Sequence, residues 1–104
     1  MAYFAAWQAR DADRFRGLLA DDVSWEGPSW RAITAEQCMA AFHQASSLVT
    51  SVDIQHIWVD GDDVLTWIEV RTGDESARPI ANWTHVTDGR ITRIRATSDL
   101  LPSS

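Results

Sequence analysis

Residues 3–28, with the sequence YFAAWQARDADRFRGLLADDVSWEGP, decide more about the fold than any other stretch of the chain. Apolar residues recur here at the spacing of one helical face in two groups, Phe4 with Trp7 and Phe15 with Leu18. Between these groups lies the polar sequence Arg-Asp-Ala-Asp, which favours a break in the backbone. The pattern therefore predicts two short helices, followed by a short strand that ends at Gly-Pro.

The spacing of the apolar residues changes from helical to alternating further along the chain. Thr34 and Gln37 form a capping-box pattern, which predicts the start of a third helix. Apolar and polar residues then alternate, which is typical of strands, and Asp88-Gly89 is a strong hairpin signal. On this alternation, Val52, Ile54, His56 and Trp58 should share one face of a strand. The predicted elements are helices over residues 2–9, 12–20 (N-cap Asp11) and 35–46, and strands over 23–26, 52–58, 64–72, 78–87 and 90–98.

Helices followed by an antiparallel meander indicate an α+β fold, and 104 residues suit a single domain over residues 1–104. Hydrophobic residues make up 45% of the chain and include six tryptophans. Indoles are bulky and carry one N–H donor, so they suit the walls of a ligand cavity. They serve equally well as filling for a core or a subunit interface, and the sequence leaves both interpretations open.

The negative net charge of the chain disfavours some classes of partner. Nine Lys or Arg residues against 15 Asp or Glu give a net charge of −6, which disfavours binding to nucleic acid or to anionic membranes. The single cysteine, Cys38, excludes a disulfide within the chain and agrees with a cytoplasmic location. No apolar run is long enough to span a membrane, and no signal peptide precedes the first helix.

Residues 3–28, together with HVTDGRITRIRATSDL at 85–100, resemble the nuclear transport factor 2-like superfamily. This superfamily includes SnoaL-like polyketide cyclases, ketosteroid isomerases and limonene epoxide hydrolases. The resemblance implies a cone-shaped α+β barrel, in which N-terminal helices pack into a curved antiparallel sheet. It also implies a homodimer formed through the outer face of that sheet. We expect that outer face to carry Ile68, Val70, Val86, Arg93 and Arg95.

The catalytic residues of two of these families are not intact. The resemblance to ketosteroid isomerases places Tyr3 at the position of an oxyanion-hole tyrosine, but Gly27 at the position of the general base and Ala81 at that of the second oxyanion donor. The resemblance to limonene epoxide hydrolases places Ala96 at one acidic position and Glu69-Val70-Arg71 where an Arg-x-Asp pair is expected. Neither mechanism is therefore predicted for this chain.

A site specific to this chain can still be predicted. Strand parity, combined with the resemblance, places Glu69, Arg71 and His85 on the cavity face. Glu69 or His85 would then move a proton, Tyr3 would stabilise an oxyanion, and Arg71 would bind an anionic substituent. No cofactor and no metal site are predicted, because the three histidines lack ligand spacing. The predicted catalytic residues are Glu69, His85 and Tyr3, and the predicted ligand-binding residues are Trp7, Trp25, Trp67, Arg71, Trp83 and Ile94.

Two functions remain open at this point. One is a cofactor-independent acid–base enzyme (an isomerase, cyclase, dehydratase or hydrolase) that acts on a small apolar substrate. The other is a non-catalytic module that binds a ligand or dimerises and has a vestigial cavity. Glu69 and Arg71 also have a structural interpretation, as an ion pair or as residues of the solvated face. A perturbed carboxylate in the cavity would favour the enzyme, and a closed interior packed with tryptophan would favour the module.

Overall fold

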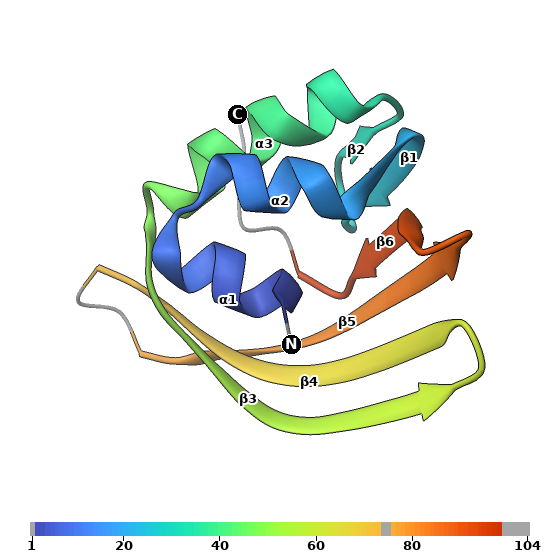
Figure 1. Ribbon diagram of the computed structural model, residues 1–104. Helices are drawn as coiled ribbons and strands as arrows, with labels where there is room; N and C mark the ends of the chain where they lie inside the picture. The colour runs from blue at the N-terminus through green and yellow to red at the C-terminus, as the bar shows by residue number, and fades with distance from the viewer. Residues whose placement is uncertain (1, 74–75, 99–104) are drawn as a thin grey trace.

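The computed structural model describes residues 2–73 and 76–98, in which three α-helices pack against one side of a curved six-stranded sheet (Figure 1). This arrangement confirms the predicted α+β class. The sheet is mostly antiparallel, and its strands follow the order β2-β1-β6-β5-β4-β3. The elements are α1 (Ala2–Ala9), α2 (Ala12–Leu18), β1 (Leu19–Glu26), β2 (Arg31–Ala32), α3 (Ala35–Ser46), β3 (Val49–Asp60), β4 (Asp63–Thr72), β5 (Arg78–Thr87) and β6 (Arg90–Ala96).

Side-chain caps fix where α2 and α3 begin. The Asp11 carboxylate accepts a hydrogen bond from the backbone N–H of Arg14 at 3.1 Å, and the Thr34 hydroxyl accepts one from Gln37 at the same distance. The Gln37 side chain in turn accepts from the backbone N–H of Ile33 at 2.9 Å. These bonds satisfy N–H groups that the first turn of a helix leaves without partners. Both predicted N-caps are therefore confirmed.

The segment after α2 differs from the prediction. The helix ends at Leu18, and β1 begins at Leu19 instead of residue 23. The short strand β2 was not predicted; it pairs with the end of β1. Strand β1 also pairs in parallel with β6, so it joins the sheet through residues that are far apart in the sequence.

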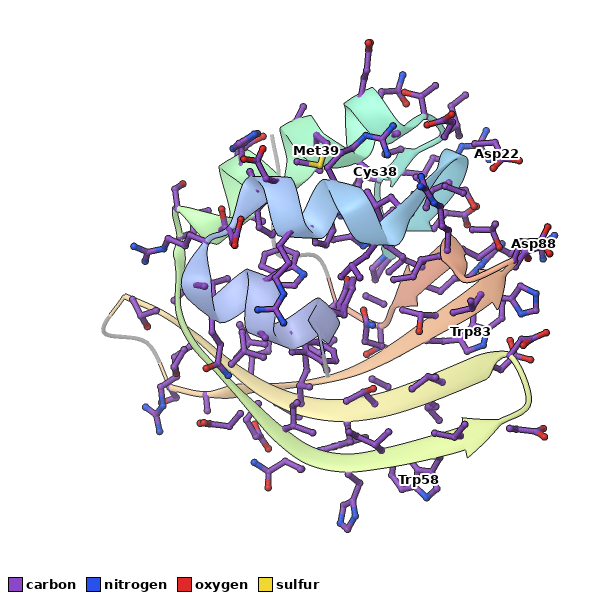
Figure 2. All side chains as sticks on the ribbon, viewed as in Figure 1. Asp22, Cys38, Met39, Trp58, Trp83 and Asp88 are labelled. Atoms are coloured by element: carbon purple, nitrogen blue, oxygen red, sulfur yellow. The ribbon has the colours of Figure 1, made fainter. Side chains whose placement is uncertain are left out.

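A bulge in β3 makes the predicted alternation wrong. The register between β3 and β4 shifts between Ile54 and His56, so one extra residue enters the strand. Because an extra residue reverses the faces that follow it, Val52 faces the helices whereas His56 and Trp58 project to the outer side. Figure 2 shows Trp58 pointing away from the helices.

The predicted faces of β4 are also reversed. Ile68 and Val70 are 4% and 2% exposed and belong to the core, whereas Trp67 is 42% exposed. Glu69 and Arg71 share the face of Trp67, because alternate residues of a strand point the same way. Ile68 and Val70 therefore do not lie on the outer face, and Trp67, Glu69 and Arg71 do.

Strand β5 shows the same reversal. Ile80 and Asn82 are buried on the helix side, and Trp83 and His85 lie on the outer side. Val86 packs against the core and not on the outer face. Arg93 and Arg95 are exposed there as predicted, and they alternate with the fully buried Ile94.

An aromatic cluster fills the space between the helices and the sheet. Phe15 is fully buried and stacks on Phe42, with 4.2 Å between ring centroids. Trp7 packs edge-on against both of these rings and against Trp25. This packing explains why residues 3–28 decide the fold, since they supply most of the cluster. None of the helices in the described ranges is long and apolar enough to cross a membrane.

Candidate functional site

A small cavity lies beside the aromatic cluster, between α1 and the helix side of the sheet. It encloses about 30 Å³, which is room for about two water molecules. Tyr3, Trp7, Trp25, Trp30 and Asn82 contribute its aromatic and amide surfaces. The remaining wall residues are Phe4, Ala45, Val49, Val52, Ile68, Val70, Ile80, Ala96 and Ser98.

Tyr3 is the titratable residue of this wall. It is 4% exposed, and burial raises the pKa of its phenol far above the ordinary value. The neighbouring Trp7 and Asn82 side chains act to lower this pKa, but desolvation outweighs them. The Tyr3 hydroxyl therefore keeps its proton at neutral pH and can act as a hydrogen-bond donor.

Two polar nitrogens of the wall are buried without a hydrogen-bond partner. They are the indole Nε1 of Trp30 and the amide Nδ2 of Asn82. Trp30 stands in the connection between β1 and β2, where its ring packs edge-on against Trp25 at 5.1 Å. Asn82 is 5% exposed and projects from β5, which also contributes Ile80 to the cavity wall. A buried donor without a partner is energetically unfavourable, because it has lost its hydrogen bonds to water and gained none from the protein.

A second hollow lies on the opposite face of the sheet. It is an open groove of about 680 Å³, and its walls include Asp63, Trp83, His85 and Arg93. One carboxylate oxygen of Asp63 accepts hydrogen bonds from His85 Nδ1 at 2.7 Å and from Trp83 Nε1 at 2.9 Å. These two donors, His85 foremost, hold the pKa of Asp63 below its usual range. Trp83, labelled in Figure 2, lies on this outer side of β5.

The family model of the SnoaL-like domain matches residues 1–94. The chain belongs to the SnoaL-like domain family. Among the curated proteins, none matches this SnoaL-like domain.

Solved structures agree with the family. A protein from Kribbella flavida DSM 17836 is 26% identical, with a TM-score of 0.87 over 94% of this chain and 81% of that one. An LEH-like epoxide hydrolase from M. tuberculosis is 27% identical, with a TM-score of 0.79 over 95% and 78%. A ketosteroid isomerase-like protein from Catenulispora acidiphila DSM 44928, in complex with trimethylamine, is 19% identical, with a TM-score of 0.79 over 97% and 91%. These similarities confirm the predicted nuclear transport factor 2-like fold.

The SnoaL-like domain does not bring the predicted catalytic residues together. Tyr3 faces the cavity, whereas Glu69 and His85 lie on the other side of the sheet. The prediction that these three residues share one cavity is therefore wrong. The cause is the reversed parity of β4 and β5.

The predicted ligand-binding residues divide in the same way. Trp7 and Trp25 line the cavity. Ile94 is fully buried in the core but is not part of the cavity wall. Three others lie on the outer face, which contradicts their predicted orientation: Trp67, Arg71 and Trp83.

Three residues of these sites were missed by reasoning from the sequence. Asn82 follows Ile80 on the inner side of β5, so correct parity would have identified it as a buried amide. Asp63 lies just before the predicted strand 64–72 and was given no role, yet it pairs directly with His85 across β4 and β5. Trp30 carried no signal in the sequence, because it follows Gly-Pro-Ser in a connection whose path depends on the tertiary structure.

Proposed function

We propose that this SnoaL-like domain binds a small, largely apolar molecule in its interior cavity and does not catalyse a reaction there. One observation carries the proposal: no carboxylate and no imidazole occurs among the described residues that line the cavity. Acid–base catalysis requires a group that exchanges a proton near the working pH and lies within reach of the substrate. Tyr3 does not qualify, because burial raises the pKa of its phenol.

The size of the cavity limits its occupant. A space of about 30 Å³ admits a larger molecule only when a wall residue moves. Trp30 is the aromatic wall residue placed in a connecting segment, and it is half-buried, so it is the part of the wall with the most freedom. The ketosteroid isomerase-like protein from Catenulispora acidiphila is in complex with trimethylamine, a molecule of four heavy atoms. We therefore expect ligands of this scale, with a rigid apolar body.

Binding can be tested with cyclopentane and cyclopentanone, added separately while intrinsic tryptophan fluorescence is recorded. We expect saturable changes with at least one compound, because Trp7, Trp25 and Trp30 line the cavity. Ala96→Val should reduce the affinity, since it adds two methyl groups to the wall. Ala81→Val is the matched control, because Ala81 precedes Asn82 on β5 and faces the outer side with Trp67. Failure of both compounds to bind would refute the proposed function.

The absence of catalysis needs a separate assay. An acid–base enzyme with a bound ketone would accelerate exchange of the α-hydrogens with solvent. We therefore expect cyclopentanone deuterated at its α-carbons to lose deuterium at the same rate with and without the protein. Acceleration abolished by Ala96→Val, but not by Ala81→Val, would place catalysis in the cavity and contradict this part of the proposal.

A specific observation also favours self-association through the outer face of the sheet. Trp58, Leu65 and Trp67 are 52%, 41% and 42% exposed on adjacent strands, and we call them the outer patch. Large apolar side chains gathered on one face are typical of a surface that another protein covers. The exposed Arg93 and Arg95 on the same face and the chain's net charge of −6 favour a second copy as the partner.

Sedimentation equilibrium tests this dimer. Trp67→Glu should weaken it by at least about tenfold, because the substitution places an unpaired charge in the interface. The matched control is Leu48→Glu, since Leu48 is 40% exposed but lies between α3 and β3. A wild-type protein that stays monomeric at all concentrations would refute the dimer.

A further inference from the structure

A row of polar side chains crosses four adjacent strands on the outer face of the sheet. Asp63 on β4 is the register partner of His85 on β5, and His85 is the partner of Arg93 on β6. Ser24 on β1 stands next to Arg93 in the same row, and all four residues line the outer groove. Because neighbouring strands lie about 4.8 Å apart, side chains directly opposite each other are within reach. The row therefore brings a carboxylate, an imidazole and a guanidinium together in that order.

The bond to Asp63 determines which nitrogen of His85 is free. An ionised carboxylate can only accept hydrogen bonds, so His85 Nδ1 donates in the 2.7 Å bond and Nε2 of the neutral ring carries no proton. Trp83 Nε1 donates to the same carboxylate oxygen at 2.9 Å and helps to orient it. Within the described ranges, His85 Nε2 has no hydrogen-bond partner and is not a buried atom, so it is accessible at the wall of the groove. An accessible imidazole nitrogen, oriented by a carboxylate, has the arrangement of a general base.

From this row we infer that the outer groove is a catalytic site that hydrolyses a small neutral ester, with His85 as the general base and Asp63 as its positioning residue. The groove is distinct from the interior cavity, so this inference does not depend on the proposed function. His85 Nε2 takes a proton from water while the water oxygen attacks the ester carbonyl carbon, and the carbonyl π electrons move to the carbonyl oxygen. When the carbonyl re-forms, the bond to the alcohol oxygen breaks and His85 returns the proton to that oxygen. One ester and one water thus give one acid and one alcohol.

The other residues of the groove define the substrate. Arg93 stands beside His85 and makes no ion pair with any described residue, so its guanidinium can stabilise the negative charge that develops on the carbonyl oxygen. The indole of Trp83 offers apolar surface for the body of the ester. Asp22 and Asp63 line the same groove and disfavour an anionic substrate. These contacts favour a neutral ester with an aromatic or aliphatic group.

Ser24 does not act as a nucleophile for His85. Arg93 stands between these two residues in the row, which places them two strand spacings, about 9–10 Å, apart. A nucleophile and its base must lie within hydrogen-bond reach. The Thr92 hydroxyl donates to the backbone carbonyl of His85 and also contacts the Thr87 hydroxyl at 3.2 Å, so its proton is not directed to the imidazole. Water is therefore the nucleophile that the groove favours.

Hydrolysis of benzyl chloroacetate, with both products quantified, tests the inference. The alcohol of this neutral ester is a poor leaving group, which favours attack by water over direct attack by an imidazole. The wild-type protein should exceed the same concentration of free imidazole by at least about 10²-fold, because the groove holds ester and base together. His85→Gln should lower kcat by about 10²-fold or more. His56→Gln is the matched control and should not change the rate, because His56 is exposed on the outer side of β3 and does not line the groove.

Two further variants separate positioning from charge stabilisation. Asp63→Asn should lower kcat by at least about tenfold with little change in KM, because an amide can also donate to Nδ1 and so permits the other tautomer of His85. Arg93→Gln should lower kcat by at least about tenfold through loss of oxyanion stabilisation. Arg95→Gln removes the same charge from the same face but should not change kcat, because Arg95 is paired with Glu26 at 3.0 Å and does not line the groove.

The tautomer of His85 gives a readout that does not depend on activity. In long-range ¹H–¹⁵N spectra of the wild-type protein, the neutral ring of His85 should carry its proton on Nδ1 and none on Nε2. The ring signals are assigned from their loss in His85→Gln. In Asp63→Asn the form protonated on Nε2 should increase, since the carboxylate no longer selects the Nδ1 donor.

A kcat that falls in His85→Gln and in Asp63→Asn, together with the Nδ1-protonated ring, supports the inference. Hydrolysis no faster than with free imidazole overturns it. Equal rates in the wild type and in His85→Gln also overturn it, and the ion pair would then only join β4 to β5. A neutral ring protonated on Nε2 contradicts the assigned base. An initial burst of benzyl alcohol would show direct attack by the imidazole and overturn the water mechanism.

Discussion

Asn82→Leu should make the ligand-free protein more stable. Asn82 is 5% exposed, and its Nδ2 has no hydrogen-bond partner. A buried donor without a partner costs about 1–3 kcal/mol, and leucine has the same branched shape without the polar atoms. We therefore expect the free energy of unfolding to rise by about 1–2 kcal/mol.

Urea denaturation, followed by tryptophan fluorescence, measures this change. For a domain of this size, 1 kcal/mol corresponds to a shift in Tm of about 4 °C or more, so thermal unfolding gives an independent value. The m-value should stay constant, because the surface exposed on unfolding hardly changes. Asn82→Asp is the control of matched shape, and at neutral pH it should destabilise the protein because it buries a charge without a cation.

A loss of more than about 1 kcal/mol of stability in Asn82→Leu would refute this prediction. Such a loss would mean that the amide N–H is satisfied in the native protein, since the loss of a paired buried hydrogen bond has this size.

Three further predictions concern the fold. Phe15→Ala should lower the free energy of unfolding by about 3–5 kcal/mol, because Phe15 is fully buried and stacked on Phe42; a loss below about 1 kcal/mol in urea denaturation would contradict this packing. Thr34→Ala should cost about 1 kcal/mol through loss of the α3 cap, and an unchanged denaturation midpoint would show that the cap is unimportant. Asp63→Asn should destabilise the protein at pH 6 but progressively less below about pH 4, because the folded-state pKa of Asp63 is depressed and its contribution disappears on protonation. A stability difference from wild type that does not change between pH 6 and pH 3 would refute that assignment.

Local signals predicted much of the fold. Asp11 and Thr34 marked helix starts that depend only on bonds within the next three residues. Asp88 and Gly89 have φ values of 53° and 80°, which is the left-handed conformation that a two-residue hairpin turn requires. These features depend on neighbours in the sequence, so the sequence alone reveals them.

The faces of the strands depend on more distant contacts. The bulge between Ile54 and His56 appears only where β3 pairs with β4, and it reverses the faces of the residues that follow. In β4, the aliphatic side chains Ile68 and Val70 indicated the buried face, but the family resemblance placed Glu69 and Arg71 on the cavity side, which gave the opposite parity. Regular alternation of aliphatic and charged residues is therefore stronger evidence for the inner face of a sheet than a distant resemblance.

The same parity determines what the site can do. Glu69 and His85 lie beyond the sheet from Tyr3, and adjusting a rotamer cannot bring a side chain through a hydrogen-bonded sheet. An acid–base site in the cavity would require a carboxylate at an inner position that now holds Ile68 or Ile80. Such a carboxylate would lie in an apolar wall that lacks a cation, so its pKa would rise toward neutrality, as a general base requires. The fold therefore retains the environment that would activate a base, and the inner aliphatic residues are the reason that a binding function is favoured over catalysis.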